Sequence, residues 1–531
     1  MKKSKIRQVI GEKEIKKAYK ILSAYRDGKR ALEKRITENE EWFKLRCCGF
    51  KNSEEEIKQS SPWLFNSIIN KHADAMDSYP EPNVLPREKA DEKEAKMLSK
   101  ILPALLEQMN FEQIYSDVWW YKLKTGTGIY GVFWNSSLYG GLGDIDIKQL
   151  DILNLFWEPG IKHIEQSANL FYAQAVEKER LLAEYPFATE GLKNASQTLE
   201  AYRLDDNSVD QSKVLVVDWY YKKRVEGKEI LHYCKFAGDT VLFASENEKE
   251  YQMRGFYDHG RYPVVFDTMF VTENSPAGFG YIDVMKGGQR SIDRLDSAIL
   301  RNTLMAETPR WFISDAAGIN EEEYADWERP FIHTTGRIDD QTLKQVEVEG
   351  INSLALDLLK FKVSELKETS GNRDFTQGGT TSGVTAASAI LALQESGSKL
   401  SRDMVKASFR AYSEICYLIV ELIRQFYTEP RSFRITGEKS KTDFVTFSSN
   451  QFSAKEEINL LGSELLARRP IFDIKIVPQK QNPYQKARQN ELAKELFSLG
   501  MLSKERRDEA RLAIKMMDFE GKEELLSKLS D

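Results

Sequence analysis

Three glycines are the first residues in this sequence whose spacing suggests chemistry. Gly126, Gly128 and Gly131 in KTGTGIYGVFWN form G-x-G-x-x-G, the spacing of a dinucleotide-binding turn. That chemistry needs a strand entering the turn and a helix leaving it, because free N–H groups at the helix N-terminus bind the pyrophosphate. Here the amphipathic segment FEQIYSDVWWYKLK precedes the glycines and the β-rich run IYGVFW follows them. The reversed order argues against dinucleotide binding. It predicts that Gly126 or Gly128 ends a helix with a positive φ, and that Gly131 lets a strand pack closely.

Other catalytic signatures do not occur in the sequence. The Gly-Lys pairs at 28–29, 227–228 and 521–522 are followed by Arg or Glu, so no phosphate-binding G-x-x-x-x-G-K-[ST] exists, and no G-x-S-x-G exists either. The five histidines are far apart, which makes a dedicated zinc site improbable. Asp144 and Asp146 form D-x-D, a possible metal pair, although a solvent-facing strand explains the pattern better. We therefore expect no catalytic residue, no cofactor, no metal and no enzyme.

Composition indicates an ordinary globular protein. The chain has 531 residues, 41% apolar and 30% charged, which predicts two to four domains. Four cysteines, two of them adjacent at Cys47 and Cys48, do not make a disulfide framework and favour a reducing compartment. The N-terminal sequence has no apolar h-region, and the most apolar helical stretch, 415–423, is short and interrupted by Glu421. A secretion signal and a membrane span are not expected.

Charge is unevenly distributed along the chain. Residues 1–46 hold fifteen Lys and Arg against seven Asp and Glu, a net of +8 in a chain whose total is −6. A basic N-terminal arm suits contact with nucleic acid or with an acidic partner. A solvated face of a peripheral helix explains the same charges equally well.

Periodicity predicts alternating helical and strand blocks. Ser61 and Pro62 mark a helix start, a helix follows over 91–109, and residues 128–272 indicate an antiparallel meander with a short helix near 178–185. Long helices are then predicted over 280–307, 351–369 and 384–427, with Ile351, Leu354, Leu358 and Leu359 as the apolar stripe of the second. Residues 308–350 carry short strands and a helix of their own. Strands return after 430, and helices are predicted over 484–498, 503–517 and 521–529.

The order of these blocks resembles the portal proteins of tailed bacteriophages. The matching stretches are GRYPVVFDTMFVTENSPAGFGYIDVMKGGQRSIDRL (260–295), NRDFTQGGTTSGVTAASAILALQE (372–395), the helix–glycine–strand step at 124–134 and FDIKIVPQKQNPYQKARQNELAKELFSLGML (472–502). The resemblance implies an α+β portal fold. Its implied parts are an N-terminal helical arm (1–60), a wing (61–279), a stem helix (280–307), a clip (308–350), a second stem helix (351–371), a tunnel loop (372–383), a long wing helix (384–428), further wing strands (429–483) and a helical crown (484–531).

The same resemblance implies a function at the virion. It implies a ring of twelve subunits at one capsid vertex, assembled in the host cytoplasm, through which double-stranded DNA is packaged and ejected without sequence preference. Implied partners are the terminase, a head–tail adaptor, the major capsid protein and the scaffold protein, with no membrane. An acidic chain suits such a conduit, because each phosphate neutralised by Lys or Arg tightens binding. Another head–tail connector or a baseplate protein would look alike, and a nucleotide-dependent enzyme rests on G-x-G-x-x-G alone.

Candidate site residues follow from the predicted channel. The loop 372–383 combines three glycines, which lower the cost of changing backbone shape, with uncharged polar groups that suit phosphates; a plain interhelical connector is the alternative. Basic residues of the second stem helix are candidates to guide DNA, unless they pair with Asp357, Glu365 and Glu368. A basic stripe on the long helix is a candidate subunit contact or, less simply, a DNA contact. The candidates are, in the loop, Asn372, Arg373, Asp374, Phe375, Thr376, Gln377, Thr380 and Thr381; on the stem helix, Lys360, Lys362 and Lys367; and on the long helix, Lys399, Arg402, Lys406 and Arg410.

Overall fold

A computed structural model shows the chain as two compact units. It describes residues 9–46, 61–189, 192, 213–307, most of 310–346, 353–371, 399–436, 442–447, 455–458, 465–468 and 470–478, with isolated residues beyond. The first unit comprises Met1–His72, Asp117–Gly131 and Lys148–Ala407, and the second comprises Ala73–Ser116, Val132–Ile147 and Ser408–Asp531. Helices and sheets are mixed within each unit, which confirms the predicted α+β class.

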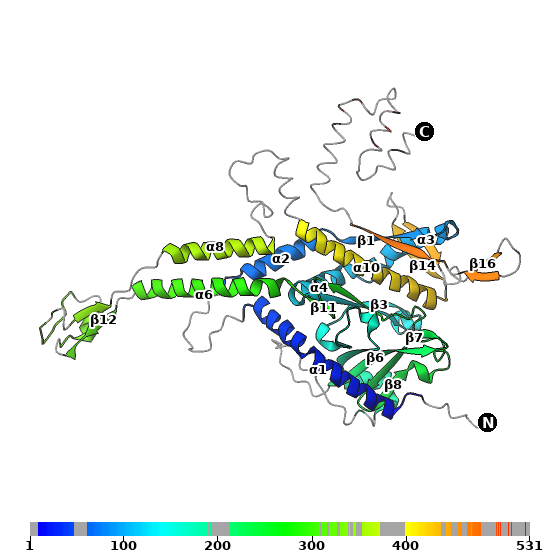
Figure 1. Cartoon of the computed structure of the whole chain (residues 1–531), viewed down its shortest axis with the longest axis horizontal. Coiled ribbons are helices and arrows are strands. Elements are labelled where there is room, and N and C mark those ends of the chain that lie inside the picture. The colour runs from blue at the N-terminus through cyan, green and yellow to red at the C-terminus, as the bar shows by residue number, and fades with distance from the viewer. Residues whose placement is uncertain are drawn as a thin grey trace. The chain divides into compact units, whose positions relative to one another are not determined.

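The first unit contains a five-stranded antiparallel sheet (Figure 1). Its strands are adjacent in sequence order, as the predicted meander requires. The turn between the third and fourth strands is tight, because Glu226 and Gly227 both have positive φ, of 49° and 83°. A short helix, α5 (Lys178–Glu184), follows the second strand as expected. The strands are β4 (Leu155–Trp157), β5 (Asn169–Glu177), β6 (Lys213–Val225), β7 (Lys228–Ala237) and β8 (Thr240–Ala244).

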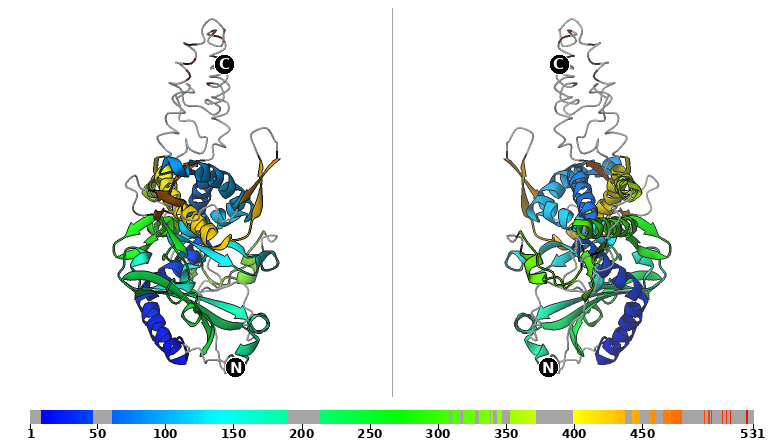
Figure 2. Two further views of the ribbon diagram at one scale, coloured as in Figure 1. Left: turned by 90° about the vertical axis from the view of Figure 1, so that its right-hand side faces the viewer. Right: turned by 90° about the vertical axis from the view of Figure 1, so that its left-hand side faces the viewer.

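The N-terminal helix α1 (Glu12–Phe43) packs on this sheet, as Figure 2 shows. Ile15, Ala18 and Leu22 are buried in one core cluster with Phe171 and Phe236 of the sheet. The expectation of a peripheral charged helix was therefore wrong for α1. Its exposed cations lie on one face, and Ile15, Ala18 and Leu22 recur at i, i+3 and i+7 on the other, which suffices for burial.

The glycine step joins a helix to a strand. Helix α4 (Phe111–Thr125) ends immediately before β2 (Thr127–Asn135), and β2 pairs with β9 (Val264–Thr268) in a sheet of order β3-β2-β9, with β3 at Asp144–Gln149. The hairpin β10 (Phe270–Thr272) and β11 (Ser275–Phe279) then leads into the first long helix. The predicted order, helix then strand, is confirmed.

Two long helices of the first unit lie side by side, α6 (Tyr281–Glu307) and α8 (Ser353–Ser370) (Figure 1). Leu366 of α8 approaches Gly288 of α6, where a Cβ would lie 3.3 Å from the leucine Cδ1. The residues between the helices include the antiparallel pair β12 (Arg310–Ile313) and β13 (Leu343–Val346) and the short helix α7 (Glu321–Ala325). These elements agree with the strands and helix predicted inside 308–350.

The second unit is built on pairings between distant segments. Strand β1 (Pro80–Pro86) pairs antiparallel with β18 (Phe472–Pro478), and α3 (Glu92–Gln108) packs against β1. From Ser408 onwards, α10 (Lys399–Phe426) contributes Ile415, Leu418 and Leu422 to the core. The remaining elements are α2 (Trp63–Met76), which crosses the boundary between the units in sequence, and the antiparallel pairs β14 (Arg431–Thr436) with β15 (Thr442–Phe447) and β16 (Lys455–Ile458) with β17 (Leu465–Arg468).

The D-x-D pattern was misinterpreted as solvent-facing. Asp144 is buried in the second unit, where it accepts a hydrogen bond from the Tyr427 hydroxyl and lies 3.6 Å from an Arg431 guanidinium nitrogen. Asp144 is thus a buried ion-pair acceptor, a role that its neighbours in sequence do not reveal. The helices predicted over 484–498, 503–517 and 521–529, and the loop 372–383, lie outside the continuously described residues.

Candidate functional site

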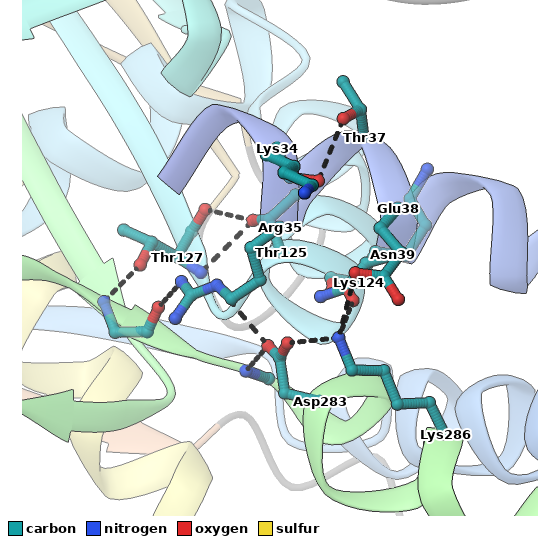
Figure 3. A network of polar contacts seen from close by, with 12 residues as sticks. Lys34, Arg35, Thr37, Glu38, Asn39, Lys124, Thr125, Thr127, Asp283 and Lys286 are labelled. Carbon is teal, nitrogen blue, oxygen red and sulfur yellow. Dashed lines mark hydrogen bonds and ion pairs between the residues drawn. The ribbon is translucent and has the colours of Figure 1, made fainter. Parts of the chain in front are cut away.

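Three segments of the first unit meet around the start of α6 (Figure 3). They are the C-terminal half of α1, the turn between α4 and β2, and the step from β11 into α6. We call this meeting point the α6 junction and define it by Arg35, Lys124, Gly126, Asp283 and Lys286. It lies where α6 begins, so its contacts determine how α6 is anchored to α1 and to the turn between α4 and β2.

Gly126 allows the two backbone segments of the junction to touch. Its φ is +89°, and its N–H donates to the Lys122 carbonyl at 2.9 Å, which closes α4. A Cβ on Gly126 would lie 2.2 Å from the carbonyl carbon of Phe279. The expected positive-φ helix end is therefore confirmed at Gly126. Gly128 is also closely packed, because a Cβ there would lie 2.3 Å from Val118 Cγ1. Close packing at Gly131 stays a prediction.

Arg35 of α1 binds the entry to α6. Its guanidinium donates a hydrogen bond to the Gly278 carbonyl and lies 3.9 Å from the Asp283 carboxylate. Asp283 in turn accepts from the Gly280 N–H at 3.0 Å, a side-chain cap on the first turn of α6. On the opposite side Gly278 donates its N–H to Thr127 Oγ1 at 2.8 Å. The strand-to-helix step is thus held from both sides.

Lys286 and Lys124 extend the network along α1. Lys286 of α6 lies 3.7 Å from Glu38 and 3.5 Å from Asp283, and donates to Asn39 Oδ1 at 3.3 Å. Asn39 is fully buried and its amide donates to the Lys124 carbonyl at 3.2 Å. Lys124 pairs with Glu40 at 2.8 Å. Glu38 of α1 therefore contacts α6, Glu40 contacts the end of α4, and Asn39 contacts both.

The N-terminus of α2 is capped from α6. Gln289 Oε1 accepts from the Leu64 N–H at 3.1 Å, and Asp293 accepts from the Ser61 N–H at 3.3 Å. The Ser61 hydroxyl, predicted to cap the helix itself, donates instead to Asp296 at 3.3 Å. Gln289 and Asp293 are buried one helical turn apart, so this stretch of α6 is a binding surface for the start of α2.

A Ser–His–Glu cluster in the sheet resembles a hydrolytic site only in composition. His232 Nδ1 lies 3.1 Å from Ser245 Oγ and its Nε2 lies 3.5 Å from Glu246. Burial lowers the pKa of His232, more than the Glu246 charge raises it. However, His232 and Ser245 are both fully buried, and Ser245 Oγ already accepts from the Tyr233 N–H at 3.0 Å. A substrate could not reach this serine, so we assign the cluster to the core.

The predicted basic residues of α8 lie on its accessible surface. Lys360 is exposed and lies 3.9 Å from Asp357, and Lys362 pairs with Glu365 at 2.7 Å. Lys367 lies over the Trp63 ring, 5.4 Å from its centroid. The pairs with Asp357 and Glu365 are those named as the alternative to DNA contact, although exposed pairs of this kind hold weakly.

The other predicted site residues are only partly described. Lys406 and Arg410 are exposed on α10, which also includes Lys399 and Arg402 in its first turn. The loop residues 372–383 lie outside the part of the chain that the structure describes. Within that part, groups of His, Cys, Asp and Glu that could hold a metal ion do not occur. Among the same residues, every helix is too short or too polar to cross a bilayer.

Sequence reasoning missed the α6 junction. Its strongest signal was the run Arg35, Glu38, Asn39 and Glu40, polar residues that interrupt an otherwise simple amphipathic helix. Their partners lie between 84 and 248 residues away, so only the folded chain identifies them.

The α6 junction is a network of hydrogen bonds and ion pairs that anchors the start of α6. A comparison with protein families matches the Phage P22-like portal protein family over residues 66–531. The chain therefore belongs to the P22-like family of phage portal proteins. Membership implies an oligomeric, structural protein of the capsid vertex in the virion, with capsid and packaging components as partners. A search of curated proteins gave no match.

Proposed function

We propose that this chain forms a ring of twelve subunits at one capsid vertex. Double-stranded DNA is packaged and later ejected through its channel. The ring first docks the terminase motor and then the head–tail adaptor, and it contacts the major capsid and scaffold proteins. In this proposal α6 and α8 are the stem, residues 308–350 the clip, and residues 484–531 the crown. Family membership supports the portal role, and the α6–α8 pair with its terminal strands supports the assignment of the parts.

One observation carries the ring proposal. Helix α8 buries Leu366 and Ser370 but exposes several large apolar side chains. Leu358 is 43% and Phe361 63% exposed, three residues apart on one side of the helix, and Leu354 is 70% exposed one turn earlier. The predicted stripe of Leu354 and Leu358 thus faces away from the core of its own unit. Contiguous exposed apolar surface marks a contact with another molecule, and in a ring that molecule is the neighbouring subunit.

The test is the oligomeric state of purified full-length protein. Negative-stain imaging and light scattering should show rings of about twelve subunits for the wild type, as the family resemblance implies. Phe361→Asp should abolish or strongly weaken ring formation, because it places a charge in an apolar interface. Phe187→Asp is the matched control, since Phe187 is 67% exposed on a different element of the same unit. A monomeric wild type, or equal effects of the two substitutions, would refute the proposal.

The channel residues remain proposals with their own test. We assign the loop 372–383 to contact with moving DNA through Asn372, Arg373, Asp374, Phe375, Thr376, Gln377, Thr380 and Thr381. Deleting 372–383 should leave rings intact and impair packaging; loss of rings would make the loop a structural connector. Lys360, Lys362 and Lys367 are proposed to guide the DNA backbone. Lys399, Arg402, Lys406 and Arg410 are proposed to meet an acidic face of the next subunit.

A further inference from the structure

The outer face of α1 carries a concentrated positive charge. Seven cations and only two acids are exposed along this helix, a net of +5 on one face of an acidic chain. Both acids are already paired, Glu12 with Lys16 at 2.5 Å and Asp27 with Arg30 at 2.8 Å. We call the seven cations the basic face: Lys13, Lys16, Lys17, Lys20, Arg26, Arg30 and Lys34.

Five members of the basic face have no polar side-chain partner among the described residues. Within the described chain, no hydrogen bond or ion pair links the side chains of these five to another residue. The opposite face of α1 performs the anchoring, through its apolar residues and through Arg35 and the buried Lys29. Like charges four residues apart on a helix destabilise it by a few tenths of a kcal/mol. These five are Lys13, Lys17, Lys20, Arg26 and Lys34.

The chemistry of the face selects the partner. Protein interfaces have an apolar core and are depleted in lysine, but between Glu12 and Phe43 no large apolar side chain is exposed on α1. Single-stranded nucleic acid binds by stacking bases on aromatic rings. The tyrosines of α1 instead turn inward, with Tyr19 5.1 Å from Phe236 and Tyr25 6.0 Å from Phe171 between ring centroids. Cations without apolar or aromatic neighbours match the phosphates of a duplex.

We infer that the basic face of α1 binds the phosphate backbone of double-stranded DNA without sequence preference. From Lys13 to Lys34 the helix extends about 32 Å, close to one turn of B-form DNA. Its residues differ from the channel candidates Lys360, Lys362 and Lys367 and from those of the loop 372–383. The inference rests on the proposed function only in taking duplex DNA as the polyanion that the protein meets, and it adds a second DNA contact to that function.

The experiment measures binding of full-length protein to a fluorescent 30-bp duplex by anisotropy as the salt concentration rises. Five phosphate contacts predict a slope of about −4.5 in log K against log salt, or an affinity loss of about a hundredfold between 50 and 150 mM. Replacing the five unpaired cations together by alanine should flatten the slope by about 4 and weaken binding at least tenfold at 100 mM salt. Alanine favours helix, so α1 should persist, as circular dichroism would verify.

The matched control removes the same charge elsewhere in the first unit. Lys162, Lys213, Arg224, Lys228 and Lys249 are also exposed. Replacing them together by alanine should change DNA affinity by less than about threefold, because screening limits distant charges. Equal weakening of DNA binding by both variants would refute the inference, because binding would then depend only on the net charge of the protein. The inference would also be refuted if replacing Lys360, Lys362 and Lys367 by alanine abolished DNA binding and the α1 substitutions did not.

The remaining outcomes separate this inference from the proposed function. If the wild type does not bind the duplex at 50 mM salt, the inference is wrong. If the α1 variant then also fails to form rings, the basic face is a contact between subunits. If the α1 substitutions weaken DNA binding as expected while wild-type protein never forms rings, the ring proposal fails and the inference stands.

Discussion

Replacing Gly126 by alanine should destabilise the α6 junction more than any other single methyl addition on this backbone turn. An L-residue in the left-handed region costs about 1–2 kcal/mol. The added Cβ would also lie 2.2 Å from the carbonyl carbon and 2.4 Å from the Cα of Phe279. Both are backbone atoms at the entry to α6, and so the clash cannot be relieved by a side-chain rotation. Overpacking of this kind costs about 1–3 kcal/mol, and the total loss should be about 3 kcal/mol or more.

Gly227→Ala is the control that isolates the clash. Gly227 has φ +83°, close to the +89° of Gly126, but a Cβ there would meet nothing within 4 Å. Its substitution should therefore cost only the conformational part, about 1–2 kcal/mol. Urea unfolding followed by tryptophan fluorescence compares the two variants with the wild type. Equal losses for Gly126→Ala and Gly227→Ala would show that β11 and α6 yield freely, and the rigid junction described above would be wrong.

Two further predictions concern the interior of the first unit. Lys122 and Asp267 form a fully buried ion pair at 2.6 Å. In urea unfolding, Lys122→Met should therefore lower the free energy of unfolding by about 3–5 kcal/mol, and adding Asp267→Leu should recover most of that loss. A double variant as unstable as the single one would contradict this. Burial lowers the pKa of Lys29 to about 7, against some stabilisation of its charge by Glu33. The unfolded chain therefore binds the Lys29 proton more tightly than the folded chain does. Between pH 7 and 10 the stability of the wild type should rise by about 3 kcal/mol relative to Lys29→Met. Parallel pH profiles of the two proteins would refute the lowered pKa of Lys29.

Much of the element order could be predicted because it depends on local pattern. The helix before Gly126 and the strand after it follow from periodicity, as do the meander and the long helix beginning at Tyr281. The order of helix, glycines and strand also argued against a phosphate-binding turn from the sequence alone. In each of these cases neighbouring residues contain the whole signal.

The predictions that failed concern residues whose role depends on a partner distant in the sequence. Gly126 requires glycine because Phe279 approaches it, and Asp144 is buried because Tyr427 and Arg431 surround it. Helix α1 was interpreted as peripheral because the fifteen cations of residues 1–46, nine of them in α1, obscure a narrow apolar stripe. The exposed side of α8 shows the converse, since a stripe that predicts a core contact faces out of its own unit.

The pairing of β1 with β18 has a consequence for synthesis of the protein. Arg87, at the end of β1, bonds Asp473 across 386 residues of chain. At about 5–20 residues per second, a ribosome needs about 20–80 s to supply that partner. Throughout that interval β1 is an open edge that invites pairing between nascent chains. Its sequence, PEPNVLP, has proline at three of seven positions, and each proline removes a donor that an intruding strand would need. The composition of β1 thus protects the growing polypeptide until its own C-terminal strand emerges.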